Sequence, residues 1–385
     1  MNRRKLMGLT QNILSIPTAS FREHGVRAAL EDLAKSLHLP TYIDDWGNLH
    51  VTYKRGRQRF RHLLLAHLDH PGFIVTEDWR GGGRLPGQVW CRWFGRVAES
   101  YFVGARVKVQ TASGPVSGTI TAIRSGGSPR RVEWIRVLTP KAVLRGDFGS
   151  WDLPSYSLRG DRLATRSADD LVGCSVLAAL LATLAQEKPA AWVEVVYTRA
   201  EEAGLVGATS LAESHYLPKE TPVLALEASM TMPGAILGSG PVIRTGDLAS
   251  CFDPGICHHL IQLAAKLKRQ ERQFRFQRCL MDGGTTEASA FAAFGYRAAG
   301  LAFPMLNYHN QGQKRITTEE VDVTDLTNGL ALLKSYVTTP WPREGWPAPA
   351  DQKMFRQLAK SKSEHLKESR RHGLVHWKTG PGRKS

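Results

Sequence analysis

The sequence reads WVEVVYTRAEEAGLVGA over residues 192–208, and this stretch decides the fold. Its first part, Trp192 to Thr198, is a short apolar and β-branched run typical of a buried strand. Glu201 and Glu202 follow that strand, and a glycine-bearing segment then leads into a predicted helix from Val206 to His215. Because open α/β sheets gather their ligands at the carboxyl ends of strands, the stretch predicts an acidic site at that edge.

The same alternation of strands and helices continues on both sides. Strands are predicted at Arg61–His67, Val223–Glu227, Phe274–Cys279 and Ala298–Phe303, and helices at Phe21–Leu37, Leu171–Gln186, Ile256–Lys268, Thr286–Phe294 and Val323–Tyr336. Alternating elements of this kind predict a three-layer α/β/α domain around a mostly parallel sheet.

A change in the residue pattern marks a second domain. Between residues 79 and 161, short β-branched runs such as Arg106–Thr111 and Thr119–Arg124 are separated by turns, and a glycine run at 81–83 opens the segment. This pattern predicts a small β-barrel-like domain inserted into the first. The catalytic domain is therefore expected at 1–78 and 162–339, the β insertion at 79–161, and a flexible proline-rich linker with a basic tail at 340–385.

Composition limits the class of protein. The 385 residues carry a formal charge of +16, of which residues 351–385 contribute +7 from six lysines and four arginines against three acidic residues. Such a tail is more often a solvated face than a nucleic-acid site, so nucleic acid is not expected as a partner. No apolar run is long enough to span a membrane, and no signal peptide is recognised. With five irregularly spaced cysteines, these features predict a cytoplasmic protein with reduced thiols.

Five short motifs carry side chains suited to metal binding. They are His67-Leu68-Asp69, Asp169-Asp170, Glu201-Glu202, Glu227 and His309, each at or near the end of a predicted element of one sheet. Alone, each is as readily a helix cap, a surface charge or a hydrogen-bonded loop residue.

Taken together, the five motifs supply the ligands of two divalent ions. Asp169 would bridge the ions, His67 and Glu227 would complete the first site, and Glu202 and His309 would complete the second. Asp69 would orient an imidazole, and Glu201 would remain free as the general base for an activated water. Zinc is the expected metal, with cobalt or manganese as alternatives.

The order of these motifs, with Leu237-Gly238-Ser239-Gly240-Pro241 and Gly283-Gly284-Thr285, resembles the glutamyl and tetrahedral aminopeptidase family of dinuclear zinc peptidases, and more distantly aminoacylase and carboxypeptidase relatives. The resemblance covers about residues 5–338. It implies the same site roles, namely His67, Asp169, Glu202, Glu227 and His309 as ligands with Asp69 and Glu201 as catalytic residues. It also implies a homo-oligomer in which the β insertion helps subunits associate.

Four positions depart from the family pattern. Glu227 stands where aspartate is commoner, Leu171 and Leu306 replace arginines, and Thr286-Glu287 follows the Gly-Gly-Thr motif where an aspartate is expected. The leading hypothesis is an aminopeptidase that removes the N-terminal residue of short peptides. A hydrolase of N-acyl amino acids or modified dipeptides is the close alternative, and a non-catalytic binding protein with a basic tail is the third.

Overall fold

The computed structural model describes residues 2–57, 61–77, 87–127 and 130–341, together with helical positions 353, 356, 357, 359, 360, 363 and 367. The chain divides into two units, residues 1–340 and residues 341–385. The glycine run at 81–83 and most of the basic tail lie outside the described residues.

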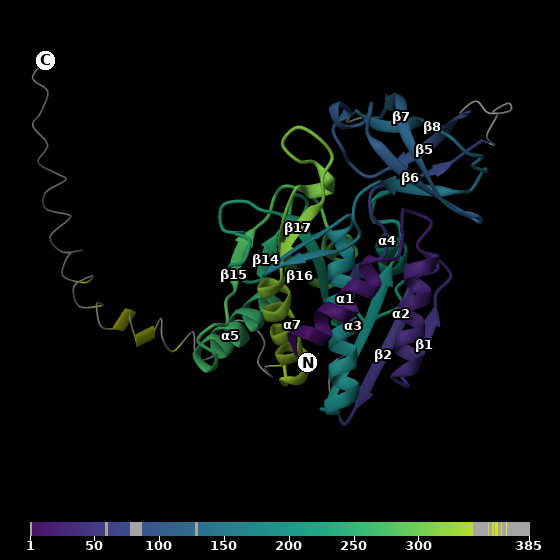
Figure 1. Ribbon diagram of the computed structural model, residues 1–385. Coiled ribbons are helices and arrows are strands. Elements are labelled where there is room, and N and C mark those ends of the chain that lie inside the picture. The colour runs from purple at the N-terminus through teal and green to yellow at the C-terminus, as the bar shows by residue number, and fades with distance from the viewer. Residues whose placement is uncertain are drawn as a thin grey trace, which may run out of the picture. The chain divides into compact units, whose positions relative to one another are not determined.

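An 11-stranded mixed sheet forms the centre of the first unit (Figure 1). In spatial order its strands are β1 (Thr41–Ile43), β2 (Leu49–Arg55), β12 (Ala191–Thr198), β3 (His62–His67), β13 (Pro222–Met230), β16 (Arg297–Leu306), β17 (Glu319–Asp322), β11 (Arg162–Thr165) and β10 (Ser157–Arg159). Off this path, β14 (Val242–Gly246) pairs with β16, and β15 (Gln277–Leu280) pairs with β14. The four central strands β12, β3, β13 and β16 run parallel, and the other strands of this path pair antiparallel. The register places Thr198 opposite His67, so these two strands end together.

Helices cover the sheet and bury its central strands. They are α1 (Arg3–Leu14), α2 (His24–Ser36), α3 (Ala168–Glu187), α4 (Val206–Glu213), α5 (Pro254–Gln270), α6 (Glu287–Ala293) and α7 (Val323–Thr338). Helix α3 packs on β3 and β13 and against α1, α2 and α7, whereas α6 packs on β13 and β16 and against α4. All six residues of β3 are buried, as expected for a strand covered on both faces. The predicted α/β fold class is confirmed.

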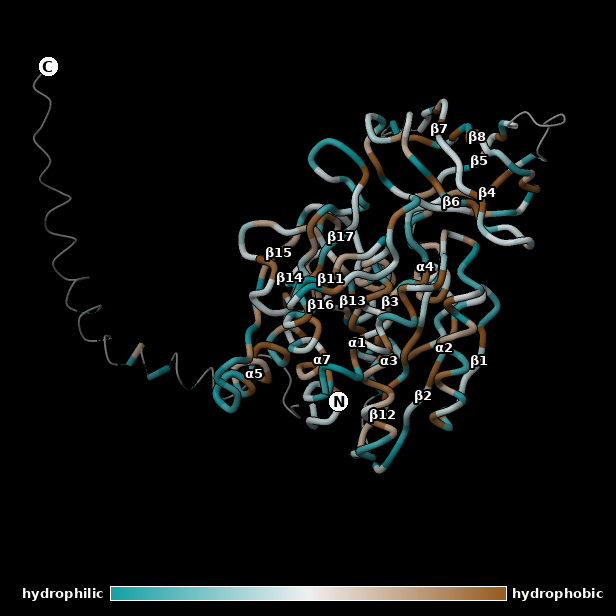
Figure 2. The backbone as a smooth tube through the Cα atoms, viewed as in Figure 1, coloured by the Kyte–Doolittle hydropathy of each residue, from teal (hydrophilic) through white to brown (hydrophobic). Residues whose placement is uncertain are grey.

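Helix α3 is the most apolar of these elements. By length and composition it could cross a membrane, yet 89% of its apolar window is buried inside the protein. Figure 2 shows hydrophobic colour concentrated on the interior elements and hydrophilic colour on many outer turns. The helix therefore has the position of a core helix.

Six strands close into a separate small barrel (Figure 1). They are β4 (Gly72–Val75), β5 (Gly87–Phe94), β6 (Arg106–Thr111), β7 (Gly114–Gly126), β8 (Arg131–Thr139) and β9 (Phe148–Trp151). The barrel has its own core, in which the ring of Trp151 lies 4.8 Å from that of Trp93 and 5.4 Å from that of Phe102. Strand β4 precedes the predicted start of the insertion, and β10, before its predicted end, pairs in the large sheet instead.

Two differences from the predicted elements have local causes. The helix predicted from Phe21 begins only at His24, because Phe21 has a φ of 65°, outside the right-handed helical region. The N-terminal helix α1 was not predicted, although the side chain of Asn2 accepts a hydrogen bond from the main-chain nitrogen of Lys5 and caps it.

Two histidines are buried beside Tyr336 at the opposite end of β3 from His67. His62 and His259 are 5% and 6% exposed, and burial lowers the pKa of each ring to about 4. In the unfolded chain these rings bind protons below about pH 6.5, so protonation favours unfolding as the pH falls from 6.5 toward 4.

We expect wild-type protein to lose about 2 kcal/mol more stability than His62→Leu between pH 7 and pH 4.5, because the leucine cannot be protonated. Denaturant unfolding at a series of pH values measures the difference. His24→Leu, at an exposed histidine, is the control and should follow the wild-type profile. Parallel pH profiles for wild type and His62→Leu would contradict the prediction.

Candidate metal centre and active site

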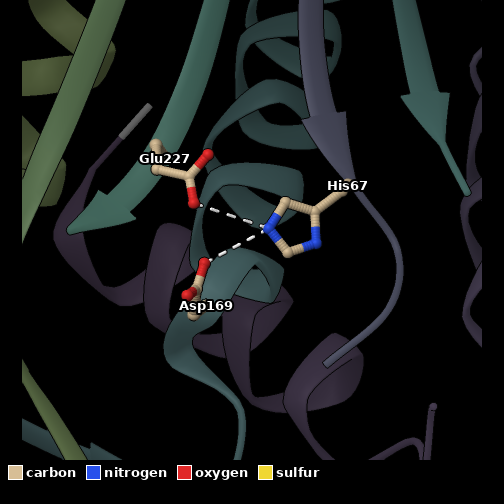
Figure 3. A group of neighbouring side chains, drawn as sticks. All are labelled: His67, Asp169 and Glu227. Carbon is tan, nitrogen blue, oxygen red and sulfur yellow. Dashed lines mark hydrogen bonds and ion pairs between the residues drawn. The ribbon is translucent and has the colours of Figure 1, made fainter. Parts of the chain in front are cut away.

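The first group of candidate ligands comes from β3, β13 and the start of α3. His67 ends β3, and its Nε2 atom lies 3.2 Å from Oδ1 of Asp169 and 3.6 Å from Oε1 of Glu227. Figure 3 shows the three side chains pointing toward one another. All three are buried, so the group is a compact N/O cluster at the carboxyl end of the parallel strands.

A second group uses the other oxygen of the same aspartate. Nε2 of His309 lies 3.3 Å from Oδ2 of Asp169 and 3.0 Å from Oε1 of Glu202. His309 belongs to the short helix η2 (Tyr308–Asn310), which follows β16. The structure thus brings all five predicted ligands together in two groups that share Asp169.

The donor set fits divalent cations. In each group the ligand atoms lie within 4.8 Å of one another. Oε2 of Glu227 is buried and has no hydrogen-bond partner among the described residues, which leaves a carboxylate oxygen available to a cation. Imidazole nitrogen and carboxylate oxygen are the ligands expected of a zinc site.

Buried charges dominate the electrostatics of these groups. Burial and the carboxylate of Asp169 raise the pKa of Glu227 to about 8. Burial opposes ionisation of Asp169, yet hydrogen bonds from His309 and His67 hold the pKa of this carboxyl far below the usual range. A cation among these carboxylates would favour their ionised forms, which is the opposite of what burial alone does.

Asp69 holds two parts of the site in place. Its carboxylate accepts hydrogen bonds from the main-chain nitrogens of Glu201 at 2.9 Å and Glu202 at 3.2 Å, and from Oγ of Ser20 at 2.6 Å. Its Oδ1 atom also lies 3.4 Å from Nδ1 of His67. Burial opposes ionisation of Asp69, but the bonds from His67 and Ser20 still lower its pKa. Asp69 therefore fixes the end of β3 against the turn after β12.

Two cavities meet at Glu201. A small one of about 70 Å³ is lined by Glu227, Arg244 and three methionines. A larger one of about 380 Å³ is lined by Glu202 and His309. Both are also lined by Glu201, Tyr308 and the Gly283-Gly284-Thr285 motif. Burial raises the pKa of the Glu201 carboxyl, which faces both cavities without belonging to either ligand group.

Sequence reasoning missed the residues that hold Asp169. The carboxylate of Glu319 accepts hydrogen bonds from the main-chain nitrogens of Ala168 at 2.6 Å and Asp169 at 3.2 Å. Nδ1 of His70 donates to the main-chain oxygen of Asp169 at 2.6 Å. His70 directly follows Asp69, so a second histidine beside the first motif was a usable signal, whereas nothing local to Glu319 indicates its role.

The barrel contributes a contact to the second group. Nδ1 of His309 donates to the main-chain oxygen of Arg96 at 2.7 Å, and Arg96 lies in the loop after β5. The ring of Tyr308 stacks on that of His309 with centroids 3.7 Å apart. These two contacts orient the His309 ring with its Nε2 atom toward Asp169.

The positions that depart from the family pattern lie in different surroundings. Leu171 is fully buried in α3 and lines neither of the two cavities. Leu306 is 36% exposed at the end of β16. Glu287 is buried at the start of α6, where burial raises its pKa to about 7.

Comparison with known proteins gives consistent matches. A sequence profile described as M42 glutamyl aminopeptidase matches residues 139–328. The Bacillus subtilis (strain 168) protein named "Putative aminopeptidase YhfE" is 26% identical over 291 residues, which are 68% of this chain and 80% of that protein.

Solved structures agree over most of the chain. Aminopeptidase APDkam598 from the archaeon Desulfurococcus kamchatkensis is 25% identical with a TM-score of 0.70, and the match covers 87% of this chain and 95% of that one. The dodecamer PhTET1-12s is 25% identical with a TM-score of 0.69, covering 88% and 99%. The profile match includes β12, β13 and both glutamates after β12, and the structural matches extend to the barrel and the large sheet. The chain is therefore similar to the M42 glutamyl aminopeptidases, over residues 139–328 in sequence and over most of its length in structure, and it is a hydrolase that acts on peptides.

Proposed function

We propose that the protein is a metal-dependent aminopeptidase that removes the N-terminal residue of short peptides, with Glu201 as general base. The observation that carries the proposal is the position of Glu201. Its carboxyl group faces both cavities beside two candidate ligand groups and belongs to neither. A free carboxylate next to the reacting atoms is what general-base catalysis requires.

Two divalent ions would be held by the two groups. His67 and Glu227 would hold one ion, Glu202 and His309 the other, and Asp169 would bridge them, as its two oxygens face the two imidazoles. Zinc fits this donor set best, and cobalt or manganese would also be accepted. When bound, such ions supply Lewis-acid polarisation of the scissile carbonyl and lower the pKa of a water.

Glu201 would move the proton in both halves of the reaction. Its carboxylate takes a proton from water as the water oxygen attacks the carbonyl carbon. The same proton then passes to the leaving nitrogen as the C–N bond breaks, which yields a free amino acid and a peptide shorter by one residue. Asp69 keeps Glu201 in place through the main-chain hydrogen bond at 2.9 Å.

The small cavity supports cleavage after a single residue. Met230, Met232 and Met281 line it beside Glu201 and Glu227, and its volume of about 70 Å³ leaves room for one side chain. Methionine side chains adapt to irregular apolar groups. We therefore assign this cavity to the side chain of the N-terminal residue, while the rest of the peptide occupies the larger cavity.

Association of subunits is part of the proposal. Val103 and Leu144, on the barrel segment, are 62% and 60% exposed, so apolar side chains are available there for contact with another subunit. PhTET1-12s, which shares the fold, is a dodecamer. These two observations support a homo-oligomer that uses the barrel.

The compartment proposed is the cytoplasm. All five cysteines, each of them described in the structure, are free, and Cys91, Cys174 and Cys257 are buried. Unpaired thiols of this kind fit a reducing compartment.

Replacing Glu201 with glutamine should lower kcat roughly 1,000-fold, because the amide cannot accept the proton of water. Steady-state assays with free N-terminal peptides measure the loss, and elemental analysis should show unchanged metal content. Glu213→Gln, on the exposed end of α4, is the matched control and should keep wild-type kcat. An active Glu201→Gln enzyme would refute the assignment. Cleavage of N-acylated peptides alone would favour the N-acyl hydrolase alternative.

The shared aspartate makes a separate prediction about metal content. Wild-type protein should hold about two ions per chain, Glu227→Gln and Glu202→Gln about one each, and Asp169→Ala close to none. Elemental analysis after dialysis measures the content, and Asp161→Ala, at a surface acid bound to Arg3, should match wild type. If Asp169→Ala retained one tightly bound ion, the bridging role would be wrong.

The methionine-lined cavity should select the N-terminal residue by size. We expect kcat/KM for N-terminal leucine or methionine to exceed that for tryptophan by at least about tenfold, because the indole does not fit. Met281→Ala enlarges the cavity and should narrow this ratio. A library of aminoacyl amides gives the ratio for both enzymes, and a ratio unaffected by Met281→Ala would place the side chain elsewhere.

A further inference from the structure

The larger cavity connects the candidate catalytic groups with the barrel. Glu201, Glu202 and His309 line it, and so do Arg96 and Arg131. A third cavity, on the barrel, shares these two arginines and none of the other three residues. The shared linings give an order along the surface, in which the methionine-lined cavity comes first, the catalytic groups second and the two arginines last.

The two arginines have no acidic partner within the described part of the chain. Two neighbouring barrel arginines are paired, since Arg130 lies 2.9 Å from Glu99 and Arg92 lies 3.0 Å from Glu133. Arg96 and Arg131 are exposed, and neither takes part in an ion pair between described residues. Two uncompensated guanidinium groups therefore face one end of the cavity.

Both arginines stand on ordered main chain. The carbonyl oxygen of Arg96 accepts the 2.7 Å hydrogen bond from Nδ1 of His309, so this residue is attached directly to a candidate metal ligand. Arg131 is the first residue of β8 and pairs with Gly126 in the β7–β8 ladder. The fold therefore sets the main-chain positions of both arginines relative to the site.

We propose that Arg96 and Arg131 form a subsite for a carboxylate on the leaving-group side of the scissile bond. The inference rests on the proposed aminopeptidase function, and it adds a substrate class. The carboxylate would be the C-terminal carboxylate of a very short peptide or the side chain of an acidic residue that follows the scissile bond. Guanidinium groups match carboxylates in geometry and remain charged at every physiological pH.

The order of the cavities gives the direction of the peptide. The N-terminal side chain enters the methionine-lined cavity, the scissile bond lies beside Glu201, and the remaining residues run toward Arg96 and Arg131. The arginines lie away from the reacting atoms, so their contact is the same in the ground state and the transition state. Such uniform binding changes KM and leaves kcat unchanged.

Three matched substrates test the subsite on the metal-loaded, full-length enzyme. They are leucyl-glycyl-glycine, its C-terminal amide, and leucyl-aspartyl-glycine amide. In wild type we expect KM for the free acid to be about fivefold lower than for the plain amide, as for an accessible ion pair. The double variant Arg96→Gln/Arg131→Gln keeps the main-chain oxygen at position 96 that accepts from His309. It should raise KM of the free acid to the value of the amide, with kcat within about twofold.

The control and the third substrate complete the design. Arg124→Gln removes another barrel arginine, one that stacks over Trp90 at 4.1 Å, and should leave all constants unchanged. A low KM for leucyl-aspartyl-glycine amide that the double variant abolishes identifies a side-chain carboxylate as a second source. High salt should shrink the wild-type preference, since it screens exposed charges.

Two different failures are distinguishable. Equal KM values for the free acid and both amides in wild type, or a double variant that weakens all three equally, would overturn the subsite while the aminopeptidase function stands. A metal-loaded wild type that cleaves none of the three would overturn the aminopeptidase function, and the subsite with it.

Discussion

The carboxylate of Asp169 is the constraint on which the site depends. Each of its oxygens faces a different imidazole, that of His67 on one side and that of His309 on the other. A buried carboxylate in this position is costly unless its geometry is fixed and its charge compensated. Glu319 binds the main-chain nitrogen of Asp169 and His70 binds its main-chain oxygen. The aspartate is thus held by its backbone, which leaves both carboxylate oxygens directed toward the two ligand groups.

Sequence periodicity predicted the strands and helices, because these depend on the local pattern of apolar and polar residues. Apolar runs such as Arg61–His67 have the composition of a strand. Because residues at the carboxyl ends of parallel strands meet at one edge of the sheet, the candidate ligands could be named from the sequence alone. Contacts between distant segments have no such signature. Glu319 lies 150 residues from Asp169 along the chain, and the bond between His309 and Arg96 spans 213 residues. The barrel strand β4 precedes the predicted start of the insertion at residue 79, and its four residues, Gly72–Val75, are too few to show a period.

Two glycines lie where the two cavities adjoin. Gly283 and Gly284 line both cavities with Glu201 and Tyr308. A Cβ atom at Gly284 would meet no atom within 4 Å, so there is open space beside this position.

The hydrogen bond from His309 to the carbonyl of Arg96 connects the barrel segment to the candidate site. An inserted domain can usually be exchanged or trimmed, because its host folds around two chain ends that lie close together. Here the barrel segment supplies the acceptor that orients the ring of a candidate metal ligand. Without the barrel segment the His309 imidazole would lose this acceptor, so the orientation of that ring depends on a residue outside the large sheet.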